Sequence, residues 1–217
     1  MPSLLRDGDV YVLNLGDGEN RFTPEWMLQV HDLLGTLRND PAPLVTVATG
    51  KIWSNGLDLE WLQANPTEFQ SYISDAQHLM AAFLELPVPT VAAVQGHAFA
   101  AGAMLALCHD TRVMREDRGW WCLPEIDIDM PFTPGMNSLI TAKLPAATAS
   151  RAMTTGHRFT GPEAKEGGVI DHLAAEDEVR PLAVELANGL TGKNPEILGE
   201  IKSTLWAGPL AALRGDH

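Results

Sequence analysis

Short apolar strands that alternate with amphipathic helices constrain the fold of this chain more than any other feature. Leu44 to Val47 lies between Pro43 and Gly50 and carries no charge, and Thr90 to Val94 is equally free of charge. Runs of this kind are typical of strands that are covered on both faces. Because helical segments separate these strands along the chain, the pattern predicts an α/β fold with buried strands.

Two helices have well-defined starts and buried faces. Thr23-Pro24-Glu25 is a typical helix start, because it offers an N-cap, a proline in the first turn and an acid near the positive end of the helix dipole. The second helix is predicted to have its cap at Thr67, followed by an apolar stripe with i, i+3, i+4, i+7 spacing. The predicted buried side chains are Met27, Val30, Leu34 and Leu37 in the first helix, and Phe69, Tyr72, Ile73, Ala76, Leu79, Met80 and Phe83 in the second.

The remaining elements follow the same alternation. The opening is predicted to be hairpin-like β structure that ends in the alternating run Val10 to Leu15, and a small-residue turn, Gly96 to Gly102, is predicted to enter an apolar helix over Ala103 to Cys108. Further strands are predicted at Thr111 to Met114 and Trp120 to Leu123, and further helices from about Pro134 onward, over Pro162 to Glu166, Val179 to Leu190 and Pro195 to Leu205. No linker or charge block divides the chain, so residues 1–217 are predicted to form a single domain.

The composition excludes several classes of partner. The 28 acidic and 15 basic side chains give a formal net charge of −13, whereas nucleic acid binding needs a basic stripe that this sequence lacks. No apolar run approaches the length that spans a membrane, and Arg6, Asp7 and Asp9 interrupt the start, where a signal peptide would be apolar. The two cysteines, Cys108 and Cys122, lie in apolar contexts and form no metal or redox motif. We therefore expect a cytoplasmic protein with reduced, buried cysteines.

Three segments contain the residues that could carry chemistry. Lys51 to Leu59 and Gln95 to Leu105 both follow a predicted strand and turn through glycine into a helix. The first amide groups of a helix have no partner within it, so two such turns that converge on one point could bind a developing oxyanion. In the third segment, Trp121 to Asp129, the acid Glu125 follows large apolar side chains.

Each segment also has a structural interpretation. Glycine turns between a strand and a helix are common in α/β domains, and Glu125, Asp127 and Asp129 would also fit the solvated edge of a strand. Ser54 has no support as a nucleophile, because the chain lacks a Gly-x-Ser-x-Gly elbow. The histidines are scattered without pairs at metal-ligand spacing, so no metal site is predicted.

In combination and in order, these segments resemble the motifs of the crotonase (enoyl-CoA hydratase/isomerase) family over nearly the whole chain. Trp53-Ser54-Asn55-Gly56-Leu57-Asp58 is similar to the family's first oxyanion segment, and Gly96 to Gly102 is similar to its second. Pro124-Glu125-Ile126 is similar to the catalytic segment. Thr155 to Ala164, followed by Gly167 to Asp171, resembles the turn before the family's C-terminal helices.

The resemblance implies a fold, a substrate and a site. The fold would be a spiral of ββα units over about residues 1–160, followed by a helical part over about 161–217 that assembles into homotrimers or hexamers. The substrate would be an acyl-CoA thioester, which brings CoA with it and needs no metal or redox cofactor. The implied site residues are Glu125 as the catalytic carboxylate, Leu57 and Ala101 as backbone N–H donors of an oxyanion hole, and Trp53, Asn55, Gly56, Gly102, Met104 and Trp121 as substrate-binding residues.

Departures from the family pattern favour one reaction within it. Family hydratases carry a second glutamate where this chain has Met104, and a thioether cannot act in general acid–base catalysis. Dienoyl-CoA isomerases use an aspartate where this chain has Thr133, and the family position of Asp127 indicates a structural role. Isomerases that move a double bond from C3 to C2 need only the glutamate that Glu125 matches. The expected function is therefore that of a Δ3–Δ2 enoyl-CoA isomerase in fatty acid metabolism, such as β-oxidation.

Two alternatives to isomerisation stay open. One is hydration of a 2-enoyl-CoA by one glutamate and an ordered water. The other is a catalytically weak acyl-CoA-binding subunit, because Glu60 replaces a lysine that helps many members of the family to hold CoA. The phosphate groups of CoA would then be held by Arg21 or Lys51, or weakly.

Overall fold

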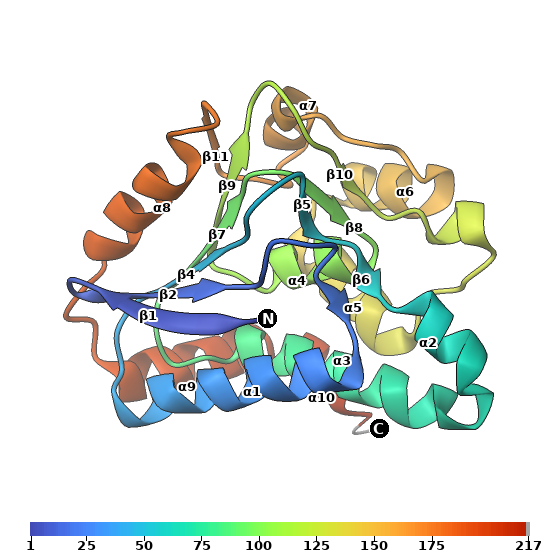
Figure 1. Ribbon diagram of the computed structural model, residues 1–217, viewed down its shortest axis with the longest axis horizontal. Helices are drawn as coiled ribbons and strands as arrows, with labels where there is room; N and C mark the ends of the chain where they lie inside the picture. The colour runs from blue at the N-terminus through green and yellow to red at the C-terminus, as the bar shows by residue number, and fades with distance from the viewer. Residues whose placement is uncertain (216–217) are drawn as a thin grey trace.

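The first two strands form the predicted hairpin in a computed structural model that describes residues 1–215 (Figure 1). Strands β1 (Ser3–Asp7) and β2 (Val10–Asn14) pair antiparallel. From β2 onward, a six-stranded sheet in the order β1-β2-β4-β7-β9-β11 continues with parallel neighbours. The added strands are β4 (Leu44–Val47), β7 (Thr90–Val94), β9 (Thr111–Arg115) and β11 (His172–Ala174).

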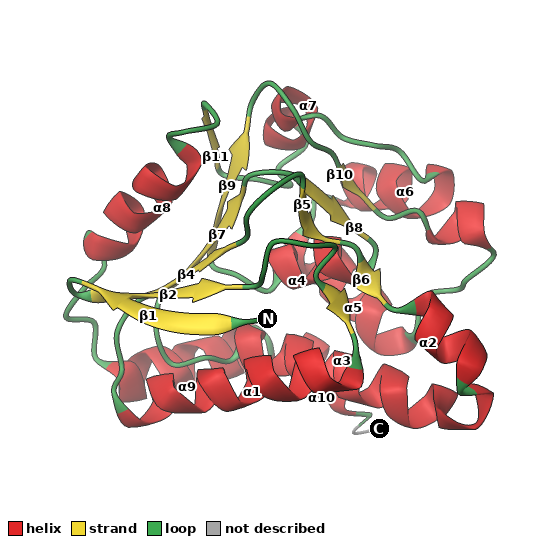
Figure 2. Ribbon diagram, viewed as in Figure 1, coloured by secondary structure: helices red, strands yellow, loops and turns green. Residues whose placement is uncertain are grey.

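This large sheet is covered on both faces, which confirms the expectation from its apolar strands. Side chains alternate in direction along a strand, so Val45 packs in one hydrophobic cluster while its neighbour Leu44 packs in the other. Helix α8 (Val179–Asn188) covers the first face through Val179, Ala183 and Ala187. Helices α1 (Pro24–Asn39), α3 (Phe69–Leu84) and α4 (Ala101–Leu107) bury their apolar faces in the larger cluster on the opposite side (Figures 1 and 2).

Smaller sheets lie beside the large one and give the fold its spiral. After each of β2, β4, β7 and β9, the chain leaves the large sheet and adds a strand to a smaller sheet before its next helix. One small sheet has the order β10-β8-β5 and the other pairs β3 with β6. Their strands are β3 (Arg21–Phe22), β5 (Ile52–Ser54), β6 (Gly56–Leu57), β8 (His97–Phe99) and β10 (Trp121–Cys122). The predicted spiral of ββα units is confirmed.

Most predicted element boundaries agree with the structure to within two residues, and one helix cap was wrong. Thr23 caps α1 as expected, with its side chain accepting a hydrogen bond from the Trp26 amide. Thr67, however, lies inside a 3₁₀ turn, η1 (Pro66–Glu68), and α3 begins after Glu68 without any side-chain cap. The apolar helix predicted from Ala103 begins two residues earlier, at Ala101.

Most of the chain after β10 is helical and packs on the core. Helix α10 (Ala207–Arg214) lies against α5 (Pro134–Lys143) and α3. Helix α9 (Pro195–Leu205) is anchored by Lys202, whose buried ammonium group donates to Asp110 Oδ2 (2.6 Å) and to the Val88 carbonyl (2.8 Å). Among residues 1–215, no helix is both long and apolar enough to cross a membrane. The remaining helices of the described chain are α2 (Leu59–Ala64), α6 (Ala146–Thr155) and α7 (Gly161–Glu166), with a 3₁₀ turn η2 at Glu125–Ile128.

Candidate active site

Two glycine turns pack backbone against backbone at the centre of the candidate site. A Cβ atom on Gly56 would lie 2.6 Å from the Ala101 amide nitrogen, and one on Gly102 would lie 2.4 Å from the Ser54 carbonyl oxygen. Gly56 also has a φ of +75°, which L side chains rarely adopt. The absence of side chains at these two positions therefore lets the β5–β6 turn and the start of α4 meet.

Ala100 adds a strained residue to the second turn. Its φ of 50° and ψ of −127° are unusual for any residue other than glycine. Its amide donates to the Cys122 carbonyl (3.0 Å), which ties the turn to the neighbouring strand β10. The next residue, Ala101, opens α4, so its own amide has no acceptor within the helix.

Buried hydroxyl groups hold the first turn. The Tyr72 hydroxyl accepts from the Asp58 amide and donates to the Phe22 carbonyl, both at 2.7 Å. The Ser54 hydroxyl donates to the Asn20 carbonyl (2.8 Å) and accepts from the Gly56 amide (3.1 Å). Both ends of the turn are thus held by hydrogen bonds.

A largely apolar cavity of about 330 Å³ opens in front of the two turns. Leu57 and Ala101 both line it, and Met104 joins them because it lies one helical turn after Ala101. Helices α3 and α5 supply Ile73 and Met136 to the wall. The rest of the lining comes from Ile52, Asn55, Leu59, Phe69, Phe99, Ala100, Cys122, Pro124, Glu125, Ile128, Met130, Pro131, Thr133 and Arg158.

Glu125 is the only carboxylic acid among the described residues that line this cavity. It is the first residue of η2, its side chain is 5% exposed, and its Oε2 atom has no hydrogen-bond partner among residues 1–215. Burial raises the pKa of this carboxyl from 4.5 to about 7. A carboxylate with that pKa is half ionised near neutral pH, where it can accept or return a proton.

The structure brings five of the nine predicted site residues to the cavity surface and places the other four behind it. Asn55, Leu57, Ala101, Met104 and Glu125 line the cavity. Trp53 and Trp121, in contrast, have no exposed surface and point into the core, where the Trp121 indole donates to the Ala103 carbonyl (3.0 Å). Gly56 and Gly102 do not line the cavity; instead they allow the two turns to pack closely against each other.

Arg21 and Lys51, which the sequence suggested as phosphate contacts, differ in how many acidic side chains surround them. Arg21 is already engaged by Glu19 (2.5 Å), Asp58 (3.4 Å) and Glu60 (3.3 Å). Lys51 is exposed and lines a hollow at the end of the large sheet together with Arg118. The sequence did not indicate Arg158, which the stretch after α6 brings to the cavity from more than thirty residues beyond Glu125.

Other residues singled out from the sequence lie outside the cavity or have structural roles in its wall. Thr133 lines the cavity, but its hydroxyl caps α5 and donates to Gln77 Oε1 (2.6 Å). Asp127 is exposed in η2. Cys108 and Cys122 are buried free thiols. Residues 1–215 contain no group of three or more His, Cys, Asp or Glu side chains arranged to hold a metal ion.

Replacement of Gly56 by alanine tests the contact between the turns, and Gly8→Ala is a matched control. Both glycines have a positive φ, but a Cβ on Gly8 would meet no atom within 4 Å. We expect Gly8→Ala to lower the free energy of unfolding by about 1–2 kcal/mol through backbone strain alone. Gly56→Ala adds a backbone clash, which raises the loss to about 3 kcal/mol or more. Equal losses in urea denaturation would show that the close approach does not constrain the fold.

Comparison with known proteins places this geometry in a family. The sequence model of the enoyl-CoA hydratase/isomerase family matches residues 7–211. Two Arabidopsis thaliana proteins, the peroxisomal enoyl-CoA delta isomerase 2 and enoyl-CoA delta isomerase 3, are each 34% identical to this chain; each match covers 95% of this chain and 92% of the relative. The solved apo structure of a Mycobacterium tuberculosis enoyl-CoA isomerase is 27% identical, with a TM-score of 0.91 over 99% of this chain and 95% of that one.

The match in sequence and the match in fold both extend over nearly the whole chain. They agree with the spiral of ββα units in the structure. The chain belongs to the enoyl-CoA hydratase/isomerase, or crotonase, family.

Proposed function

We propose that this protein is a Δ3–Δ2 enoyl-CoA isomerase, which shifts a C3 double bond of an acyl-CoA thioester to C2. The observation that carries the proposal is the pairing of one buried acid, Glu125, with a largely apolar cavity whose wall includes Met104. Two relatives of this chain are named as enoyl-CoA delta isomerases, which supports the same reaction. The pathway we propose is fatty acid β-oxidation, where such an isomerase prepares unsaturated chains for further degradation.

The proposed reaction uses one base and two backbone donors. The Glu125 carboxylate removes a proton from C2, and the electrons move onto the thioester oxygen to form an enolate. The amides of Leu57 and Ala101 stabilise that oxygen, since both residues line the cavity where the two turns meet. The enolate then collapses as C4 takes the proton back from Glu125, which leaves the double bond at C2. CoA is carried by the substrate, so this proton transfer needs no further cofactor.

The raised pKa of Glu125 suits both proton transfers, the removal of a proton from C2 and its return to C4. A carboxyl with an ordinary pKa is too weak a base to remove a C2 proton readily, whereas one near 7 is stronger and still substantially ionised at neutral pH. The cause is burial, because the apolar wall disfavours the charged form. The same wall strengthens the hydrogen bonds from the two amides to the enolate oxygen.

Hydration and weak binding are the competing functions within this family. Hydration of a 2-enoyl-CoA requires a held water, and Met104 offers only a weakly accepting sulfur at the cavity wall. A purely binding subunit would have no need for a buried carboxylate with an unpartnered oxygen, because burying a charge costs stability. Glu125 therefore favours an enzyme over a binding subunit.

We further propose assembly into homotrimers or hexamers in the cytoplasm. Helix α9 leaves Ile197, Ile201 and Leu205 exposed at i, i+4 and i+8, a stripe that a second copy of the chain could cover. Two buried free cysteines fit a reducing compartment. The name of one Arabidopsis relative, in contrast, places that protein in the peroxisome.

Replacement of Glu125 by glutamine tests the base directly. We expect Glu125→Gln to lower kcat for 3-hexenoyl-CoA by about 10²–10⁴-fold, the usual contribution of a positioned base, with little change in acyl-CoA binding. For the wild type, kcat/KM should rise with pH through a pKa of about 7, because the ionised form is the active one. The control is Asp127→Asn, which alters an exposed acid two residues away. A Glu125→Gln enzyme that keeps more than a tenth of the rate would contradict the assignment.

Introduction of a second acid at position 104 tests why this chain isomerises rather than hydrates. We expect Met104→Glu to gain hydration of 2-hexenoyl-CoA, because the new carboxylate could share a water with Glu125 across the cavity. Met104→Gln is the control of equal size without charge, and thermal melts of both variants must precede the rate measurements because a buried carboxylate destabilises the fold. A folded Met104→Glu variant without any hydration would show that position 104 does not face the reacting carbons.

A further inference from the structure

The buried polar side chains of this protein gather in two places. Among residues 1–215, eight polar or charged side chains are buried, and Asn20, Ser54 and Glu125 belong to the candidate site and its first turn. Because burial of such side chains costs stability unless they are hydrogen-bonded, the bonds of the others show what they contribute to the structure. The other five form one group with Asp110 at the end of α4: Thr46, Thr90, His109, Arg112 and Lys202.

His109, in the middle of this second group, is a neutral imidazole with one defined tautomer. Its side chain is fully buried, and burial lowers its pKa to about 3, so the ring is uncharged near neutral pH. Nδ1 lies 3.0 Å from the Leu105 carbonyl oxygen, which can only accept, so Nδ1 carries the proton. Nε2 must then accept, and the Thr46 hydroxyl donates to it at 2.8 Å. Both ring nitrogens are bonded, so the orientation of the ring is fixed.

The backbone of His109 is also held in place. Its carbonyl oxygen accepts from Lys143 Nζ at 3.0 Å and from Arg112 Nη1 at 3.3 Å. The last carbonyl groups of a helix need partners from outside its own hydrogen-bond ladder. The His109 ring supplies such a donor to the Leu105 carbonyl, so the C-terminal end of α4 is attached to β4 through Thr46.

Helix α4 connects this attachment to the reaction cavity. All seven of its residues are buried. Ala101, its first residue, lines the cavity, and Leu105 lies about 6 Å further along the helix axis. Because the helix is short and packed on every side, a shift of Leu105 would move the Ala101 amide with it.

The same imidazole ring contacts the strand that leads to the first turn. The ring centres of His109 and Trp53 are 6.2 Å apart with an interplanar angle of 73°, an edge-to-face arrangement. Trp53 lies in β5 directly before Ser54. The Ser54 hydroxyl accepts from the Gly56 amide, and Leu57 follows in β6. Trp53 is thus attached to the turn that leads to the second proposed donor, although its side chain does not line the cavity.

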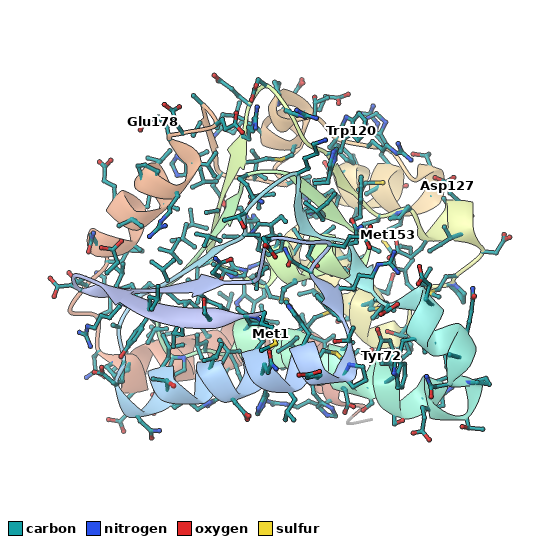
Figure 3. All side chains as sticks on the ribbon, viewed as in Figure 1. Met1, Tyr72, Trp120, Asp127, Met153 and Glu178 are labelled. Atoms are coloured by element: carbon teal, nitrogen blue, oxygen red, sulfur yellow. The ribbon has the colours of Figure 1, made fainter. Side chains whose placement is uncertain are left out.

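We infer that His109 is a positioning residue for the proposed oxyanion hole. Its ring bonds to the helix that carries the Ala101 amide and contacts Trp53 on the strand before the Leu57 amide. Tyr72 on α3, labelled in Figure 3, fixes the other end of the first turn through its hydroxyl. The inference rests on the proposed function, which supplies the enolate. It extends that function by naming the group that sets the distance between the two donors.

Misplaced donors should slow the chemical step more than they weaken binding. The enolate oxygen carries more negative charge than the thioester oxygen, so the two amides matter most in the transition state. A shift of about 1 Å caused by a change far from the reacting atoms can cost about 10²-fold in rate. Replacement of His109 should therefore lower kcat with little change in KM.

His109→Phe tests this expectation, because phenylalanine keeps a ring against Trp53 but removes both hydrogen bonds. We expect kcat for 3-hexenoyl-CoA, per folded molecule, to fall about tenfold or more, and KM to stay within about twofold. His109→Asn keeps a donor for the Leu105 carbonyl and should be faster than His109→Phe. Thr46→Val removes the hydroxyl that orients the ring and should lower kcat less; it replaces His109→Phe as the test if that variant does not fold. A folded variant with the wild-type kcat would overturn the inference.

Lys202→Met is the matched control within the same buried group. The Lys202 ammonium bonds to Asp110 and to the Val88 carbonyl, outside α4. Loss of this buried cation should lower the midpoint of urea denaturation, because it leaves buried acceptors without their partner. It should leave kcat per folded molecule within about twofold of the wild type. If Lys202→Met slows the reaction as much as His109→Phe does, the effect is general destabilisation and the inference is wrong.

The carbonyl stretch of a bound saturated ester separates this inference from the proposed function. Hexanoyl-CoA labelled with ¹³C at C1 cannot isomerise, and hydrogen bonds to its carbonyl oxygen lower the stretching frequency in an infrared spectrum. We expect the wild type and Lys202→Met to lower this frequency equally, and His109→Phe and Thr46→Val to lower it less. If this pattern is found but 3-hexenoyl-CoA is not isomerised, the proposed function fails and the role of His109 stands. If the ester is isomerised and the frequency is the same in all folded variants, the inference fails and the function stands.

Discussion

The contact between two peptide backbones at Gly56 and Ala101 is the constraint on which the site depends. No side chain fits there, because a Cβ on Gly56 would lie 2.6 Å from the Ala101 nitrogen. Each turn follows a strand of a small sheet and leads toward a helix, so the spiral of ββα units brings both turns to one place. Tyr72 and Cys122 then fix the turns from behind, through hydrogen bonds to Asp58 and Ala100. The large sheet and its helices provide the rigid support for this contact.

Few charged side chains line the cavity, and this apolar environment determines the pKa of Glu125. The apolar wall raises the pKa of this carboxyl to about 7, and Met104 keeps a second acid away. The raised pKa of Glu125 also makes the stability of the fold depend on pH. Because the folded state holds the proton more tightly than the unfolded state, the fold becomes less stable as pH rises from about 4.5 to 7. The strained backbone of Ala100 also costs stability. The strain is retained at the residue before Ala101, whose amide faces the cavity.

The fold could be predicted from the sequence largely because apolar strands and helical stripes have simple periods. The strand predicted at Leu44 to Val47 and the buried face predicted for α1 were correct. The predicted cap of α3 was wrong, because a 3₁₀ turn at Pro66–Glu68 precedes that helix. Within the site, the order of motifs indicated Glu125 and the turns, but not the directions of the side chains. Trp53 and Trp121 point into the core because they alternate with Ile52 and Cys122, which line the cavity. Arg158 could not be predicted because only the tertiary fold brings it to the cavity.

The central claim is that a single carboxylate moves one proton from C2 to C4. The most direct measurement is the fate of deuterium when 3-hexenoyl-CoA labelled at C2 is incubated with the protein in ordinary water. The account predicts 2-hexenoyl-CoA that carries deuterium at C4, because Glu125 returns the proton it removed and no other acid among residues 1–215 lines the cavity. Formation of 3-hydroxyhexanoyl-CoA as the main product, or no conversion of the labelled ester at all, would contradict the account.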